Sequence, residues 1–218
     1  MKSSFQARGA RGAAAPEAGA RPRPGRAHGT AHVPHEVRII GGQWRSRRLP
    51  VPDSPGLRPT PDRVRETLFN WLGQDLAGWV VLDAFAGSGA LGFEAASRGA
   101  AAVTLIEADA KLARGLEATR TQLGASGVTV LGTDGIAWMR RSSAQFDLVL
   151  LDPPFDANLF EAALTAAAAR VPEGGWLYLE APEAWGAEAL APLGLSLYRH
   201  LKAGTVHAHL LRKGGEAA

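Results

Sequence analysis

No cysteine occurs among the 218 residues of this chain. Its absence excludes disulfide bonds and thiolate metal sites, and it is consistent with a reducing compartment. Long apolar runs are absent too. The longest alanine-rich segment covers residues 160–169, well short of the roughly 20 residues that span a bilayer. This segment therefore predicts a buried helix, and we expect no association with a membrane.

Acidic residues are scarce at the amino end, where residues 1–36 are mainly alanine, glycine, proline and arginine. Such a segment has little to bury, so it predicts a disordered basic tail. Its arginines could add weak contacts to phosphate, and its composition also suits an organellar transit peptide. A solvated extension without a role is the interpretation that we favour among the three.

The rest of the chain has the composition of a folded domain, since 46% of all residues are hydrophobic. The formal net charge is only +3, but most of the arginine excess lies in the first half. This asymmetry suggests one basic face for nucleic acid rather than a uniformly basic protein.

Residues 37–59 predict a small hairpin extension, with one strand ending at a Gly-Gly turn and a second arm over 44–49. An arginine cluster lies on it, with one tryptophan among the arginines. Its members are Arg38, Trp44, Arg45, Arg47 and Arg48. Guanidinium groups beside an aromatic ring suit a phosphate backbone and an unstacked base, so we predict an RNA-binding surface. The alternative is a solvated hairpin face.

Residues 60–218 predict the main domain, which begins with a helix. Thr60 suits its N-cap, Pro61 its first position, and Gly73 its end. The helix either covers a cofactor pocket, with Thr60 or Arg63 reaching in, or only caps the sheet.

Strands and helices alternate after this helix, which indicates a parallel sheet covered on both faces. The predicted strands are 80–83, 102–107, 128–131, 146–151 and 176–179, and the predicted helices are 90–97, 110–123, 135–141 and 159–170. Residues 195–201 and 206–211 then predict an antiparallel hairpin at the sheet edge. His207 and His209 share a face of this hairpin, and we interpret them as exposed edge residues rather than a metal pair.

The sequence Asp152-Pro153-Pro154-Phe155 directly follows an apolar strand. Neither proline can donate to a strand ladder, so the pair ends the strand and stiffens the loop. A carboxylate and an aromatic ring are thereby fixed at the carboxyl end of a strand, where open α/β sheets bind ligands. The pair suits a planar amine such as a nucleobase. The alternative is a turn with a capping aspartate and a core phenylalanine.

A glycine loop follows the first strand of the sheet, with Asp83 before it, Phe85, Gly87 and Gly89 within it, and Glu107 ending the next strand. The pattern fits G-x-G-x-x-G, so a dinucleotide oxidoreductase competes. However, a carboxylate at the first strand end would repel a pyrophosphate, and the turn before the first glycine is long. S-adenosylmethionine fits better, with its ammonium near the first carboxylate and its ribose on the second. A plain strand–turn–helix remains the structural alternative.

Asp134 ends the next strand and is placed to accept a hydrogen bond from the adenine amino group. It is equally suited to cap the following helix. The two roles are compatible.

These residues together resemble the class I S-adenosylmethionine-dependent methyltransferases. The Asp-Pro-Pro-Phe loop matches their [Asp/Asn]-Pro-Pro-aromatic signature for amines conjugated to a planar system. Four further stretches, 38–45, 57–60, 62–71 and 83–92, resemble the RsmD family of bacterial small-subunit ribosomal RNA guanine-N2 methyltransferases. The resemblance covers about 37–212 and is strongest before Pro154.

The resemblance implies a Rossmann-like α/β fold with a seven-stranded sheet, an antiparallel C-terminal hairpin and a small N-terminal hairpin extension. It also implies that the substrate is a largely assembled small subunit. We further expect a cytoplasmic monomer, and we expect no metal, because the sequence shows no metal-ligand cluster. In this interpretation Asp152 and the Pro153 carbonyl accept the hydrogens of the target amine, and Phe155 stacks on the extruded base. The alternatives are an adenine-N6 methyltransferase on DNA or RNA, which shares the loop, and a non-catalytic RNA-binding assembly factor. A dinucleotide-dependent dehydrogenase is the least favoured of the alternatives.

Overall fold

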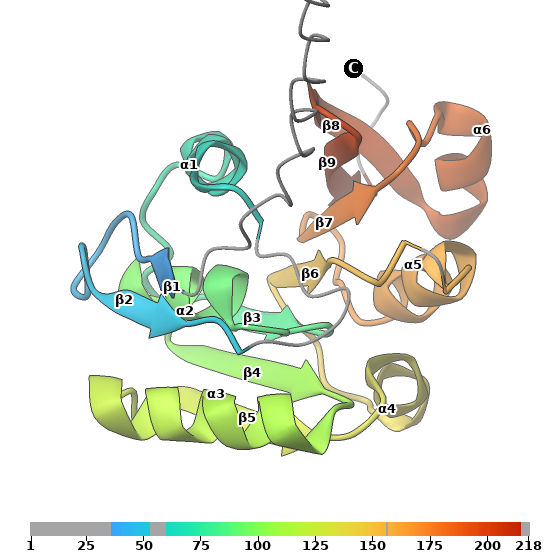
Figure 1. Ribbon diagram of the computed structural model, residues 1–218. Helices are drawn as coiled ribbons and strands as arrows, with labels where there is room; N and C mark the ends of the chain where they lie inside the picture. Colours follow the sequence, from blue (N-terminus) through green and yellow to red (C-terminus); the bar gives the residue numbers. More distant parts are fainter. Residues whose placement is uncertain (1–35, 53–59, 156, 215–218) are drawn as a thin grey trace, which may run out of the picture. The chain divides into compact units, whose positions relative to one another are not determined.

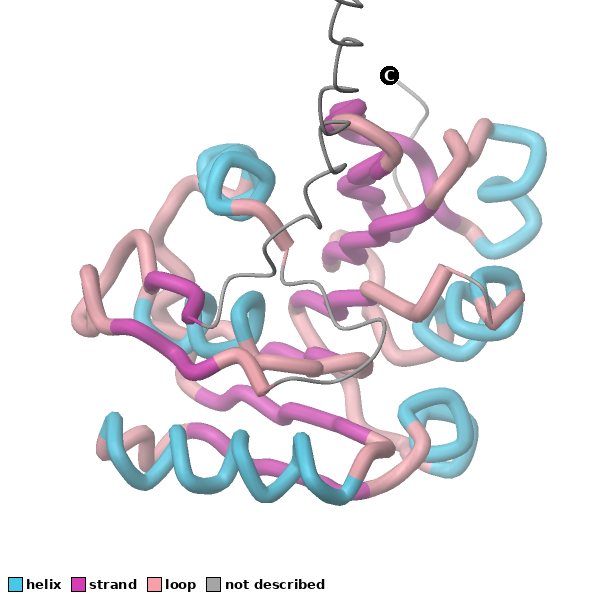
Figure 2. Tube along the Cα trace, in the orientation of Figure 1, coloured by secondary structure: helices cyan, strands magenta, loops and turns pink. Residues whose placement is uncertain are grey.

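A seven-stranded sheet forms the centre of the protein in the computed structural model, which describes residues 36–52, 60–155 and 157–214 (Figures 1 and 2). Its strand order is β5-β4-β3-β6-β7-β9-β8, and the first five strands run parallel. The strands are β3 (Val80–Asp83), β4 (Ala102–Glu107), β5 (Val128–Gly132), β6 (Leu148–Leu151), β7 (Trp176–Ala181), β8 (Leu195–Ala203) and β9 (Val206–Lys213).

The C-terminal hairpin distinguishes this sheet from a dinucleotide-binding sheet. Strand β9 is antiparallel to both β7 and β8 and lies between them. Dinucleotide-binding sheets instead continue with a sixth parallel strand beside the fifth. The predicted seven-stranded sheet with an antiparallel C-terminal hairpin is therefore confirmed.

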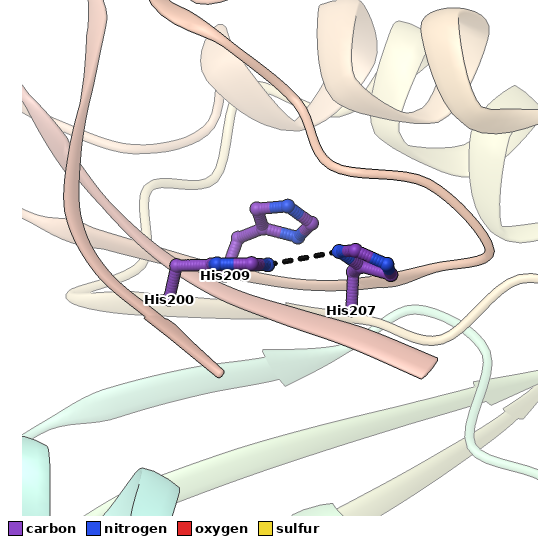
Figure 3. A group of neighbouring side chains, drawn as sticks. All are labelled: His200, His207 and His209. Atoms are coloured by element: carbon purple, nitrogen blue, oxygen red, sulfur yellow. Dashed lines mark hydrogen bonds between the residues drawn. The ribbon is translucent and has the colours of Figure 1, made fainter. Parts of the chain in front are cut away.

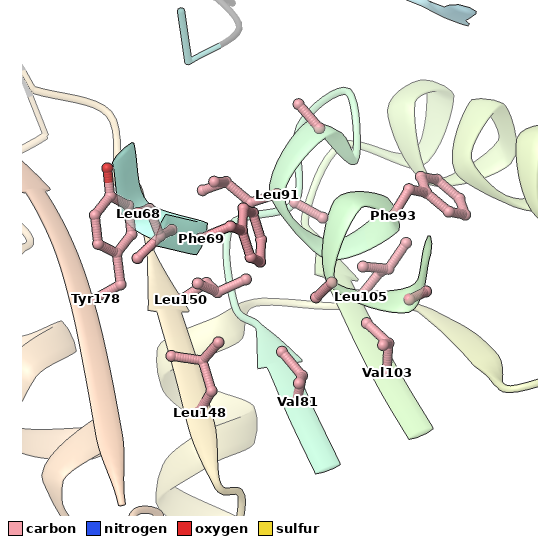
Figure 4. Close-up of a cluster of buried hydrophobic side chains, with 14 of the residues drawn as sticks. Leu68, Phe69, Val81, Leu91, Phe93, Val103, Leu105, Leu148, Leu150 and Tyr178 are labelled. Carbon is pink, nitrogen blue, oxygen red and sulfur yellow. The ribbon is translucent and has the colours of Figure 1, made fainter. Parts of the chain in front are cut away.

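Helices cover both faces of the sheet. They are α1 (Asp62–Trp71), α2 (Ala90–Ser97), α3 (Ala110–Leu123), α4 (Gly135–Arg141), α5 (Phe160–Ala168) and α6 (Ala187–Leu190), followed by a 3-10 turn (Ala191–Leu193). One core cluster joins the sheet to α1, α2 and α3 (Figure 4), and a second joins it to α4, α5 and α6. No helix in the described ranges is long and apolar enough to cross a membrane.

The N-terminal hairpin consists of β1 (Glu36–Arg38) and β2 (Arg48–Pro50), paired antiparallel. Both strands are shorter than predicted, because the chain leaves the ladder to pack against the end of α2. Gly42 has a φ of +72°, and a Cβ there would lie 1.8 Å from the Ser97 carbonyl oxygen. The tip of the hairpin therefore lies at the amino ends of the parallel strands, as Figure 1 shows. Residues 1–35 and 53–59, which hold most of the predicted tail and the end of the predicted extension, lie outside the described residues.

The start of α1 differs from the prediction. The N-cap residue is Pro61 rather than Thr60, and no side chain caps this end. The Thr60 hydroxyl is used elsewhere, because it donates to Asp152. The end of α1 is as predicted: Leu72 is the C-cap, and Gly73 follows with a φ of +88°.

Candidate active site

Acidic side chains mark the carboxyl ends of all five parallel strands. In sheet order they are Asp134 after β5, Glu107 in β4, Asp83 in β3, Asp152 after β6 and Glu180 in β7. The strand order reverses between β3 and β6, which is where open α/β sheets bind ligands. Four of the five were predicted from the sequence. The fifth, in β7, was missed, although it too ends an apolar stretch of strand.

Asp83 is a buried carboxylate with one unsatisfied oxygen. Its Oδ2 accepts a hydrogen bond from the Gly92 amide at 3.0 Å, whereas Oδ1 has no partner in the described part of the chain. Burial raises the pKa of this carboxyl to about 7. A Cβ at position 92 would lie 2.1 Å from Leu105 Cδ2, so only glycine lets α2 approach this closely. A cation placed against Oδ1 would offset the cost of burying the charge.

The glycine loop connects Asp83 to Glu107. The Gly87 amide donates to Glu107 Oε2 and the Asp109 amide donates to Oε1, both at 2.8 Å. Each oxygen keeps a second lone pair, so the carboxylate can still accept two hydroxyl groups. Gly89 has a φ of +78° and is the N-cap of α2, where a Cβ would lie 2.5 Å from a Phe93 ring carbon. Gly87 also has a positive φ of +52°, so both predicted glycines hold backbone conformations that favour glycine.

Asp134 caps α4, because its Oδ1 accepts a hydrogen bond from the Ala137 amide at 2.6 Å. The capping role is confirmed, and the second oxygen keeps its capacity for a ligand. Gly135 packs against the β3 loop, since a Cβ there would lie 2.2 Å from the Ala84 carbonyl oxygen. This contact brings the loop after β5 close to the loop after β3, which also holds the half-buried Phe85.

The Asp152 loop combines a carboxylate in an acidic environment with an exposed ring. Burial, Glu180 and Asp83 together raise the pKa of Asp152 well above its usual value. Pro153 is buried, and Phe155 is 37% exposed, with its ring centroid 6.0 Å from that of Phe160. The ring is therefore supported from one side and open to a ligand.

Thr60 is the residue of the first helical segment that reaches the site. Its hydroxyl donates to Asp152 Oδ2 at 3.4 Å, and its carbonyl accepts from Arg65 Nε at 3.2 Å. The other candidate, Arg63, is exposed.

Glu180 lies beside Asp152 on the same face of the sheet. The pair Leu151–Leu179 is in register, so the next residue of each chain segment projects to the α1 face. Glu180 is 2% exposed, and the Tyr178 hydroxyl donates to its Oε1 at 2.9 Å. Burial raises the pKa of this carboxyl as well.

A second buried charge cluster lies on the other side of Thr60, and its members alternate in sign. Arg65 is fully buried, and its guanidinium donates to Glu94 Oε2 at 3.3 Å and to the Arg38 carbonyl oxygen at 2.8 Å. The Glu94 carboxylate also binds Arg98 at 2.8 Å and accepts the amides of residues 40 and 41. This cluster joins the hairpin to α1 and α2. Position 65 shares the helical stripe of Phe69 four residues later, and this spacing is the sequence signal for its burial.

The hairpin arginines differ in their surroundings. Arg48 pairs with Glu36 at 2.8 Å and Arg38 pairs with Asp62 at 3.6 Å, both on the surface. Arg45 and Arg47 are exposed, with no acidic partner among the described residues.

Trp44 is half-buried at the hairpin tip. Its amide donates to Ser97 Oγ at 2.9 Å, and its ring packs against the core on the α1 face of the sheet. Part of the indole surface stays open.

The interpretation of His207 and His209 as exposed edge residues is wrong for His209, which is fully buried. His200 from β8 joins them, and the three offer ring nitrogens within 4.8 Å of one another (Figure 3). However, the Trp185 amide donates to His209 Nε2 at 3.0 Å, and Nδ1 lies 3.3 Å from the Leu179 carbonyl oxygen. Burial lowers the pKa of His209 to about 4. It is thus a neutral core histidine with no lone pair left for a metal.

Comparisons with known proteins agree with this geometry. The family model described as "Conserved hypothetical protein 95" matches residues 37–212. The chain is 43% identical over 183 residues to ribosomal RNA small subunit methyltransferase D of Escherichia coli K12, covering 82% of this chain and 90% of that protein.

Solved structures give the same result. The putative methyltransferase yhhF from Escherichia coli has a TM-score of 0.72 at 37% identity, covering 83% of this chain and 99% of that chain. A Thermus thermophilus 16S ribosomal RNA N2-guanine methyltransferase, solved with AdoMet and guanosine, has a TM-score of 0.63 at 23% identity. The match covers 82% of this chain and 49% of that chain, and it adds support for the fold alone.

Proposed function

Because the chain belongs to the RsmD family of small-subunit ribosomal RNA methyltransferases, we propose that it methylates the exocyclic N2 amine of one guanine in that RNA. The methyl donor is S-adenosylmethionine. The observation that carries the proposal is the placement of the Asp152 loop beside the unsatisfied carboxylate oxygen of Asp83, at the point where the strand order reverses.

The residues present fit this cofactor. Asp83 Oδ1 would accept the ammonium group, Glu107 the ribose hydroxyls, and Asp134 the adenine amine, while Gly87 and Gly89 leave room for the ligand backbone. Phe85 and Thr60 would line the same pocket. When bound, S-adenosylmethionine supplies an electrophilic methyl group.

The Asp152 loop would hold the target base. Phe155 stacks on the extruded guanine, and stacking of about 1–3 kcal/mol recovers much of the few kcal/mol that base flipping costs. Asp152 and the Pro153 carbonyl accept the hydrogens of the amine, which points the nitrogen lone pair away from both acceptors. Positioning of this kind supplies most of the rate acceleration.

The RNA-binding surface would include the hairpin. Arg45 and Arg47 have no acidic partner among the described residues and offer the strongest phosphate contacts, with Arg38, Arg48 and the open side of Trp44 adding to them. The substrate is a largely assembled small subunit, and the enzyme acts as a monomer in the cytoplasm. Adenine-N6 methylation is the second candidate, because the loop itself suits either amine. Family membership favours guanine.

The test uses small ribosomal subunits from a bacterial strain that lacks its own enzyme of this family. Incubation with the protein and radiolabelled S-adenosylmethionine should label one guanine, located by mass spectrometry of nuclease fragments. Asp152→Ala should abolish labelling and keep cofactor affinity in calorimetry. Label on adenine would favour the second candidate, and cofactor binding without any transfer to subunits would contradict the proposal.

A further inference from the structure

Glu180 has no role in the function proposed above, although it is a buried acid next to the reacting group. Glu180 follows Leu179 on β7, and Asp152 directly follows Leu151, the last residue of β6, which is paired with Leu179. Both carboxylates therefore face α1. A buried carboxylate is costly to keep unless it is paired or has a task.

The Thr60 hydroxyl lies between the two carboxylates. It donates to Asp152 Oδ2 at 3.4 Å, and it lies close enough to the neighbouring Glu180 to lower the pKa of that carboxyl. A hydroxyl has one proton and two lone pairs, so it can donate to only one carboxylate at a time. It can accept from the other only if that one is protonated. The three groups thus form a chain along which a proton can move.

The other groups that face Glu180 come from α1 and from the neighbouring strands. Tyr178 donates to Oε1, and the Arg65 guanidinium faces the carboxylate from α1. Asp83 and Asp152 approach from β3 and β6. On β9 the residue in register is Ala208, and the neighbouring histidines project to the opposite face of the sheet. Among the described residues, no neutral histidine is therefore available as a base.

Methylation of an amine must release a proton. The nitrogen lone pair forms the new N–C bond as the C–S bond breaks, and the nitrogen then loses one N–H proton to regain neutrality. Asp152 accepts that hydrogen, but its environment contains two other buried acids, Asp83 and Glu180.

We propose that the proton released by the amine passes from Asp152 through Thr60 to Glu180. Glu180 does not touch the amine, so it is a positioning residue that acts through Asp152. The N–H bond breaks as Asp152 gains a proton. Asp152 then gives a proton to Thr60 Oγ1 while Thr60 gives its own to Glu180. One N–H bond is lost and one O–H bond is formed on Glu180. The inference rests on the methyl transfer proposed above.

The experiment measures the single-turnover rate of methyl transfer to small subunits between pH 5.5 and 9, with saturating S-adenosylmethionine. Glu180→Gln keeps the side-chain shape and an acceptor for Tyr178 but cannot take a proton. We expect its plateau rate to fall by at least about tenfold, as loss of a proton acceptor does. The acidic limb of its pH–rate profile should also shift to lower pH, because the variant lacks the negative charge of Glu180 that raises the pKa of Asp152.

A second pair of variants separates the relay from structural damage. Thr60→Val should lower the plateau like Glu180→Gln, and Thr60→Ser, which keeps the hydroxyl, should restore most of the rate. Glu183→Gln, on the exposed loop after β7, is the matched control and should leave the profile unchanged.

The outcomes are distinct. An unchanged plateau or an unshifted acidic limb in Glu180→Gln would overturn the inference, and so would equal rates for the valine and serine variants. Failure of the unsubstituted enzyme to methylate small subunits would instead overturn the proposed function. If Glu180→Gln does not fold, the Thr60 pair decides alone.

Discussion

Two buried charge clusters meet at Thr60, and they differ in how well their positive and negative charges balance. In the first, Arg65 and Arg98 both pair with Glu94, and Arg65 also pairs with Asp62, so two cations face two carboxylates. In the second, Asp83 and Glu180 join Asp152 without an equal number of cations, and one oxygen of Asp83 has no partner in the described residues.

The difference indicates which cluster supports the fold and which serves a ligand. A balanced and saturated network offsets its own desolvation cost, so it stabilises the hairpin junction in the absence of ligand. An acidic cluster with an unsatisfied oxygen is destabilised until a cation or a proton arrives. A cationic cofactor and a proton-releasing reaction supply both.

The largest effect should come from breaking the balanced cluster. Glu94→Gln leaves two buried guanidinium groups without their shared carboxylate, and we expect a loss of about 3–5 kcal/mol in the free energy of unfolding. Denaturation in urea measures it. Glu117→Gln, which removes an exposed pair with Arg120 on α3, is the control and should cost less than about 1 kcal/mol. Similar losses in the two variants would remove the contrast between the clusters.

The acidic cluster should respond in the opposite sense. Asp83→Asn removes a charge that the fold buries at a cost, so we expect the ligand-free protein to gain about 1–2 kcal/mol of stability at pH 8. The same change should weaken S-adenosylmethionine binding by at least about tenfold, because the ammonium loses its carboxylate. Urea denaturation and calorimetry measure the two effects. A variant that loses both stability and affinity would place Asp83 with the structural cluster.

The pH dependence of stability and of cofactor binding follows from the Asp83 carboxyl. Its pKa is raised from 3.8 to about 7 in the folded protein, so between these values the folded state binds more protons than the unfolded state. Stability of the ligand-free protein should therefore fall as pH rises from about 4 to about 7. Cofactor affinity should rise over the upper part of this window, and binding near pH 6 should release a proton, detected by calorimetry in two buffers of different ionisation enthalpy. Asp83→Asn should abolish the release.

Much of this contrast could be predicted from sequence, because strand ends are local features. Apolar runs ending in Asp83, Glu107 and Asp152 placed three acids at one sheet edge, and Gly89 marked the start of α2. The balanced cluster could not be predicted in this way. Arg65 meets Glu94 and Arg98 only through tertiary packing, and an arginine in a helix is exposed by default.

Thr60 shows the same limit. A threonine before a proline is a typical N-cap by local rules, but in the fold its hydroxyl donates to a carboxylate 92 positions away in sequence. His209 was misjudged for a related reason, since its burial depends on the loop whose Trp185 amide it binds.

The smallest effect concerns charges that belong to neither cluster. Arg45→Ala and Arg47→Ala should each leave the free energy of unfolding within about 0.5 kcal/mol, since both side chains are exposed. Each should lower affinity for small-subunit RNA and reduce the slope of log affinity against log salt by about 1. Arg48→Ala is the matched control, because its charge is already paired with Glu36. Its effect on the slope should be smaller. Equal slopes in all three variants and the unsubstituted protein would place the RNA-binding surface away from the hairpin tip.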